Sequence, residues 1–230
     1  MNYSNSTSRI ATRGDETVNE YMTRVYNYMT IGLLISGLTA WFVSVTPALM
    51  SVVFSAPLIW IIMFAPLVMI FFFSNTLNNA SPAGAQLWFW IFAFLEGLML
   101  SSIALHYTGE SIITVFFITS AMFASLSLYG LTTKKDMSGW GKFLFMALIG
   151  LIIVMVINIF VANAMMQILI SIAGVLLFSA LIAYDTQRIK DEFISYGDIN
   201  NSAVQGALSL YLNFLNMFLF LLQLFGYKND

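Results

Sequence analysis

The sequence predicts an all-α membrane protein with seven transmembrane helices. Of its 230 residues, 60% are apolar and only 9% are charged, and the mean hydropathy is +0.85. A soluble domain carries roughly 25% charged residues. The charges are also absent from long stretches, each near the ~20 residues that a helix needs to cross a bilayer. We therefore expect the lipid bilayer to surround most of this chain.

The composition also excludes several classes of function. A net charge of −2 and a pI near 5.3 provide no basic surface for nucleic acid. The chain has no cysteine and a single histidine, which excludes disulfides, thiol nucleophiles and zinc sites built from several such ligands. We expect no resident cofactor.

Seven apolar runs mark the expected spans, and short segments rich in Asn, Ser, Pro and Gly separate them. Unbroken runs without period-two alternation favour helices over a barrel. We expect a polar cytoplasmic tail over 1–25, a transmembrane domain over 26–226 and a short outer tail over 227–230. The expected spans are 26–47, 57–73, 83–105, 111–131, 142–162, 165–184 and 203–225.

The first run is long enough to remain as a membrane helix. A secretory signal peptide has a shorter apolar core, although the small residues at 37–40 keep a cleavage site as the alternative. Small residues also recur four apart in two spans, which predicts close packing between helices. They are Gly32, Ser36 and Ala40 in the first span, and Gly97 and Ser101 in the third.

The basic residues predict the orientation. With the amino terminus in the cytoplasm, eight of the nine Lys and Arg residues fall on the inner side and only Lys228 falls outside. The inner eight are Arg9, Arg13, Arg24, Lys134, Lys135, Lys142, Arg188 and Lys190. The alternative has six spans, with the last segment dipping into the bilayer and returning, so that the carboxyl terminus also lies inside.

The last run carries a stripe of polar residues within an arc of about 80° on a helix. The stripe consists of Ser202, Gln205, Ser209, Asn213, Asn216 and Gln223. Unpaired amides in lipid cost several kcal/mol, so we expect this helix at the centre of the bundle, with its stripe facing other helices. The amides either form interhelical hydrogen bonds, worth about 0.6 kcal/mol each, or line a hydrated path.

Two acids lie within or at the edge of the spans. Glu96 lies about 20 Å from the inner surface at the usual helical rise of about 1.5 Å per residue. An acid at this depth faces the protein interior, either as a functional group or as a protonated side chain bonded to a neighbouring helix. Asp185 ends the sixth span, and an interfacial ion pair with Arg188 is the alternative to a functional role.

Several segments, in this order, resemble the transmembrane Bax inhibitor motif family and its bacterial members in particular. Together they cover nearly all of the chain past residue 20. The segments are YMTRVYNYMTIGLLISG (21–37), LEGLMLSSI (95–103), MFASLSLYGLTTKKDMSGWGKFLFMALIG (122–150), AYDTQ (183–187) and GALSLYLNFLNMFLFLLQLFG (206–226).

This resemblance implies a fold of six helices around a central seventh, in a bacterial inner membrane. It implies a calcium leak that responds to pH and, in some bacterial relatives, contact with a membrane-anchored ATP-dependent protease. The proton switch of the family is a pair of aspartates. Asp185 matches the first, but Asn213 stands at the second, where the usual LYLDFIN reads LYLNFLN.

The change at Asn213 weakens the expected pH response. Two facing carboxylates share a proton because both cannot ionise at close range. An aspartate and an amide hydrogen-bond in either protonation state. Gln223 likewise stands where relatives often carry Arg. Any counter-ion for Asp185 comes from the inner surface, namely Arg24, Lys134, Lys135, Arg188 or Lys190.

Three functions remain to be compared. The first is a passive calcium or cation leak, with Asp185, Asn213, Asn216 and Glu96 along the ion path and Ca²⁺ bound only transiently. The second is a non-conducting regulator that binds a membrane-anchored ATP-dependent protease or another membrane protein. The third is an intramembrane protease, which we set aside because the Gly-Asp pair that follows the sixth span, at 197–198, lies in a polar loop. We expect no enzymatic activity.

Overall fold

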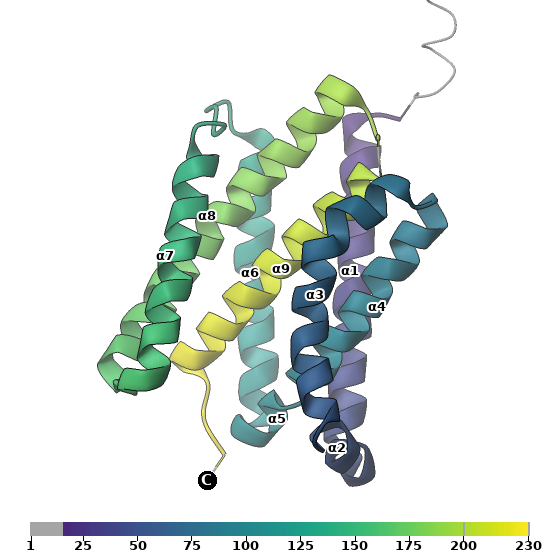
Figure 1. The fold of residues 1–230 in the computed structure, drawn as a ribbon. Coiled ribbons are helices and arrows are strands. Elements are labelled where there is room, and N and C mark those ends of the chain that lie inside the picture. Colours follow the sequence, from purple (N-terminus) through teal and green to yellow (C-terminus); the bar gives the residue numbers. More distant parts are fainter. Residues whose placement is uncertain (1–15, 200, 230) are drawn as a thin grey trace, which may run out of the picture.

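The structure, a computed structural model, describes residues 16–199 and 201–229, with the side chains of 73–79 left out. This part of the chain forms a bundle of helices (Figure 1). The helices are α1 (Val18–Ser44), α2 (Pro47–Val53), α3 (Leu58–Asn79), α4 (Pro82–Leu100), α5 (Ile103–His106), α6 (Gly109–Thr132), α7 (Trp140–Val161), α8 (Ala164–Tyr196) and α9 (Ser202–Phe225).

Each predicted span corresponds to a helix. Six helices of the described chain are long and apolar enough to cross a membrane, and the count rises to seven when α2 and α3, bent by 70°, are taken as one span. Figure 1 shows α3 returning through the bundle, and α3 packs against α4. The helix α9 runs through the bundle as one continuous helix of 24 residues. This continuity argues against the six-span alternative, which needs a reversal in the last segment.

The two largest extensions beyond the predicted spans are in α1 and α8, both at the same end of the bundle. The helix α1 begins at Val18 because Thr17 and Glu20 form a capping box, in which each side chain binds the other residue's backbone N–H. The helix α8 continues to Tyr196, twelve residues past the predicted end of its span at Tyr184. Hydropathy falls at Asp185, but the backbone stays helical.

The core of the bundle surrounds α9. The α9 span is 61% buried, against 33% or less for the other helices long enough to cross a membrane. It packs mainly against α1, α4, α6 and α8, whereas α3 lies on α4 and α7 lies on α8. The prediction of an all-α membrane fold with a central last helix is confirmed, with four helices forming the main contacts of α9.

The small residues predicted to mediate helix packing do so between α1 and α4. A Cβ atom added at Gly97 of α4 would lie 2.7 Å from the backbone oxygen of Ser36 in α1. Ser36 is buried and hydrogen-bonds to the Ala93 carbonyl of α4 at 2.7 Å. A larger side chain at Gly97 would push the two helices apart.

The two ends of the bundle differ. The start of α1, the α6–α7 loop and the α8–α9 loop lie together at one end, which we call the inner end (Figure 1). The carboxyl-terminal residues lie at the opposite, outer end, where the Thr108 N–H donates to the Tyr227 carbonyl at 3.0 Å. Arg9 and Arg13, which contribute to the predicted orientation, and most of the predicted 1–25 tail lie outside the described residues.

Candidate functional site

Asp185 lies in the interface between α8 and α9, near the inner end. It is 7% exposed. Its Oδ2 atom accepts hydrogen bonds from the Asn213 amide at 2.7 Å and from the Ser209 hydroxyl at 2.8 Å. The predicted contact between Asp185 and Asn213 is therefore present.

The second carboxylate oxygen of Asp185 binds Arg188. Arg188 donates to Oδ1 from Nε at 3.1 Å and from Nη2 at 3.0 Å, and its Nη1 donates to Glu192 at 3.1 Å. The sequence left open whether Asp185 faces the central helix or forms an interfacial ion pair. The structure shows both, so the carboxylate joins a charged group at the inner surface to the amide stripe inside the bundle.

Helical spacing explains how these four side chains meet. Asp185 and Arg188 are three residues apart on α8, and Ser209 and Asn213 are four apart on α9, so each pair shares one face of its helix. The two helices pack side by side in opposite directions (Figure 1). The prediction included Ser209 in the stripe but not in the site. Its spacing of four residues from Asn213, on the same face of the helix, could have indicated that Ser209 also contacts Asp185.

The residues after Asp185 fix α8 to two further elements. The Thr186 hydroxyl lies 3.1 Å from the Ser127 hydroxyl of α6. The Gln187 amide accepts from the Met137 N–H at 2.8 Å and donates to the Lys135 carbonyl at 2.9 Å, both in the α6–α7 loop. Three consecutive residues of AYDTQ therefore contact α9, α6 and this loop. Sequence reasoning did not assign these roles to Thr186 and Gln187.

A second polar cluster lies at the outer end of the same interface. The side-chain oxygen Oε1 of Gln223 in α9 accepts from the Gln167 amide at 2.7 Å and from the Ser171 hydroxyl at 2.9 Å, both on α8. Gln167 in turn accepts from the Asn158 amide of α7 at 3.0 Å. Ser209, Asn213 and Gln223 of the polar stripe thus face α8, whereas Ser202 bonds to Tyr21 of α1. Asn216, by contrast, donates to the Leu212 carbonyl of its own helix at 2.8 Å.

An apolar section separates the two polar clusters. Phe178 of α8 stacks on Phe220 of α9 with ring centroids 5.9 Å apart, and both are buried. Met217 is fully buried one turn closer to Asn213, and its sulfur accepts from the Ser179 hydroxyl at 3.7 Å. We call Phe178, Met217 and Phe220 the apolar section. It closes the α8–α9 interface between the inner and outer polar groups.

Glu96 lies on another side of α9 from Asp185. It is half-buried on α4, whose Phe89 and Phe92 pack against Tyr211 of the central helix. Tyr211 binds the Ser36 hydroxyl of α1 at 2.6 Å and packs against Phe89. Two residues along a helix turn its face by about 200°, so Tyr211 and Asn213 point in nearly opposite directions. The structure does not bring Glu96 to the Asp185 site.

Among the predicted inner-surface counter-ions, Arg188 contacts Asp185. Lys190 donates to the Leu131 carbonyl at the end of α6, at 2.9 Å. Lys135 lies over the ring of Trp140, 5.5 Å from its centroid, and Lys134 is exposed. These three lysines surround the inner ends of α6 and α7 instead of neutralising Asp185.

Membrane-length helices, a buried last helix and a polar α8–α9 interface define a polytopic α-helical membrane protein with one carboxylate-centred site. Residues 18–230 match the family described as "Inhibitor of apoptosis-promoting Bax1". The chain belongs to this Bax inhibitor family.

Relatives match over most of their length. An uncharacterized protein of Caulobacter vibrioides is 41% identical over 225 residues, which cover 92% of this chain and 90% of that protein. The inner membrane protein YbhL of Escherichia coli is 39% identical over 212 residues, covering 90% and 91%. An uncharacterized membrane protein of Streptococcus pyogenes is 34% identical over 226 residues, covering 96% and 98%.

Proposed function

We propose that this protein is a calcium or cation leak whose conducting state depends on the Asp185 site and responds only weakly to pH. The observation that carries the proposal is the contact of a buried carboxylate with the Asn213 amide of the central helix and with Arg188 at the inner surface. Membership of the Bax inhibitor family supports it, because the resemblance of the sequence implies this activity.

A hollow at the inner end provides an approach to the site. Its volume is about 230 Å³, and Arg188, Asp191 and Glu192 are among the residues that line it. Carboxylate oxygens are the ligands that calcium prefers, and two of these residues are acids. No group of three or more His, Cys, Asp or Glu residues lies together in the described chain. We therefore propose that Ca²⁺ passes as a transient substrate.

Conduction along the α8–α9 interface requires the apolar section to separate. In its charged form Asp185 accepts two hydrogen bonds from Arg188 and two from α9. Protonation removes the charge that attracts Arg188, which keeps its second partner, Glu192. The side-chain amide of Asn213 donates to Asp185 when Asp185 is a carboxylate, and after rotating it accepts from Asp185 when Asp185 is a carboxylic acid. The contact with α9 therefore survives protonation, and the pH response is weak.

Calcium flux from dye-loaded liposomes tests the proposal. We expect wild-type protein to raise the flux above that of empty liposomes and Asp185→Ala to lower it toward the empty-liposome rate. Asp136→Ala is the matched control, because Asp136 is an exposed acid in the α6–α7 loop and binds only the Ser138 N–H within its own loop. A wild-type flux equal to that of empty liposomes rejects the leak.

One observation favours a second function. The apolar section closes the interface in this structure, so the contacts alone also fit a regulator that conducts nothing. Such a regulator would bind a membrane-anchored ATP-dependent protease or another membrane protein. Crosslinking in native membranes followed by mass spectrometry distinguishes the two functions, because a regulator yields a reproducible partner and a pure leak yields none.

We propose an inner-membrane location, supported by the name of the Escherichia coli relative. In this proposal the inner end of the bundle faces the cytoplasm. Of the eight basic residues predicted to be cytoplasmic, all except Arg9 and Arg13 lie in described segments, and these segments are at the inner end.

A further inference from the structure

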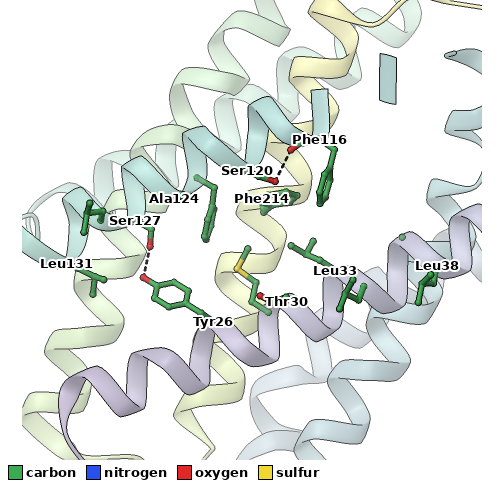
Figure 2. Close-up of a pocket in the computed structure, with 15 residues that line it drawn as sticks. Tyr26, Thr30, Leu33, Leu38, Phe116, Ser120, Ala124, Ser127, Leu131 and Phe214 are labelled. Atoms are coloured by element: carbon green, nitrogen blue, oxygen red, sulfur yellow. Dashed lines mark hydrogen bonds between the residues drawn. The ribbon is translucent and has the colours of Figure 1, made fainter. Parts of the chain in front are cut away.

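A long apolar groove separates α1 from α6, and Asp185 is not among the residues that line it. Figure 2 shows its two walls, with Tyr26, Thr30 and Leu33 on α1 facing Ser120, Ala124 and Ser127 on α6, and Phe214 of α9 between them. This part of the groove has a volume of about 630 Å³. Over most of their length, α1 and α6 therefore each contact α9 instead of contacting each other.

The groove continues toward the outer end. A second hollow of about 400 Å³ shares Leu33, Gly37, Phe116 and Phe214 with the first. Together the two hollows extend along α6 from Leu131 to Gly109, which is roughly 33 Å at the usual helical rise. The groove therefore follows α6 through the depth of the bilayer, whose hydrocarbon core is about 30 Å thick.

Most hydroxyl groups on the walls are bonded within the protein. The Tyr26 and Ser127 hydroxyls bond to each other across the inner end of the groove (Figure 2). The Ser120 hydroxyl donates to the Phe116 carbonyl at 2.8 Å. No carboxylate or amide side chain lines either hollow. The groove thus has no charged or amide side chain for a hydrated ion, and its lining matches a hydrocarbon chain.

Positive charge lies at the inner end of the groove. Leu131 lines this end, and its carbonyl accepts from the Lys190 ammonium. An ammonium has three donors, so Lys190 has two more to offer. Lys134 is exposed three residues beyond Leu131, and the nearby acid Asp136 accepts from the Ser138 N–H. Both ammonium groups therefore have donors left for a phosphate at the membrane surface.

We propose that the α1–α6 groove binds one acyl chain of an inner-leaflet phospholipid, with the lipid phosphate beside Lys190 and Lys134. An inner-leaflet acyl chain reaches about half of the ~30 Å hydrocarbon core, so it lies in the inner hollow along α1 and α6 and covers the Phe214 side of the central helix. This lipid site is separate from the proposed leak, since it uses none of the atoms that contact Asp185.

Photo-crosslinking tests the lipid site. The protein is reconstituted into vesicles of phosphatidylethanolamine and phosphatidylglycerol that contain a phospholipid with a diazirine on one acyl chain, and the labelled peptides are mapped by mass spectrometry. We expect label on the facing parts of α1 and α6 in excess of that on α7, which exposes many apolar side chains to lipid. Equal labelling of α7 rejects the site.

Substitutions that fill the groove supply the matched comparison. A Cβ atom added at Gly37 meets no other atom within 4 Å, and the same holds at Gly150 on α7. We expect Gly37→Phe to lower the label on α6 on the order of tenfold, a change equivalent to about 1.4 kcal/mol, and Gly150→Phe to leave it unchanged. Ala124→Phe fills the groove from the opposite wall and replaces Gly37→Phe if that variant does not fold.

Two results would overturn the inference. Unchanged label in both Gly37→Phe and Ala124→Phe excludes an acyl chain in the groove. Lys134 makes no hydrogen bond or ion pair with other described residues, so Lys134→Met tests the charge alone. We expect several-fold less label in this variant, and equal label rejects the phosphate position.

Discussion

At the residue scale, the site depends on how one carboxylate divides its hydrogen bonds. Asp185 gives one oxygen to the Arg188 guanidinium and the other to the Ser209 hydroxyl and the Asn213 amide. A buried charge is costly unless it is paired and hydrogen-bonded, and here both oxygens are satisfied. The carboxylate therefore stabilises the α8–α9 contact while it is charged, and any loss of a partner weakens that contact.

Replacing Asn213 by Leu should lower the free energy of unfolding by about 1–2 kcal/mol, since a charged acceptor loses a donor in a buried interface. Asn216→Leu is the matched control, because the Asn216 amide bonds only to its own helix. Thermal unfolding in detergent micelles measures both. Equal effects in the two variants would show that the Asp185 contact adds no stability.

The sequence identified part of this site. The resemblance indicated Asp185 and Asn213, and the polar stripe predicted that Asn213 faces another helix. Ser209, Thr186 and Gln187 acquire their roles from the relative positions of α9, α6 and the α6–α7 loop. A stripe specifies which face of a helix is polar, but it does not specify the height at which a neighbouring helix crosses. Glu96 was placed on the ion path because of its depth in the third span, and depth does not specify which side of α9 a neighbouring helix contacts.

At the element scale, α8 is the helix that connects the site to the rest of the protein. Its apolar part lies among α6, α7 and α9, and its polar continuation carries Asp185, Thr186 and Gln187. Hydropathy predicted the apolar part well and ended the span at Tyr184. It could not predict the continuation, because burial of polar residues 185–187 depends on partners from other helices.

Close packing at Gly130 holds α6 against α8. A Cβ atom at Gly130 would meet the Ala183 carbonyl and lie 2.9 Å from the Thr186 Cβ. Gly130→Ala should therefore destabilise the protein by about 1–3 kcal/mol through overpacking. Gly150→Ala, where the added atom meets open space, should be neutral or more stable by up to about 1 kcal/mol. Thermal unfolding of both variants in micelles checks this, and a neutral Gly130→Ala contradicts it.

At the scale of the whole molecule, the two termini of the described bundle lie at opposite ends (Figure 1). The apolar runs predicted seven spans, which agrees with the described helices when α2 and α3 are counted as one span, and the amide stripe predicted the central position of α9. The bend between α2 and α3 was not predicted, since both helices are apolar and only their 70° angle distinguishes them from one straight span. Orientation remains a prediction from the basic residues.

Cysteine labelling tests the orientation in a chain that has no cysteine of its own. Lys134→Cys and Lys228→Cys each add one thiol, in the α6–α7 loop and in the carboxyl-terminal tail. A membrane-impermeant maleimide should label Lys228→Cys in intact spheroplasts and Lys134→Cys only after permeabilisation. The reverse pattern contradicts the proposed orientation.

The most direct test of the proposed switch compares the calcium flux through Asn213→Asp with that through the wild-type protein in liposomes. The flux is measured between about pH 5 and 8, on both sides of neutral pH. A second carboxylate facing Asp185 makes the two acids share a proton. We predict that the flux of Asn213→Asp changes steeply with pH, approaching the limit of about tenfold per pH unit for one proton, while that of the wild type changes little. Identical pH profiles for the two proteins would contradict the account.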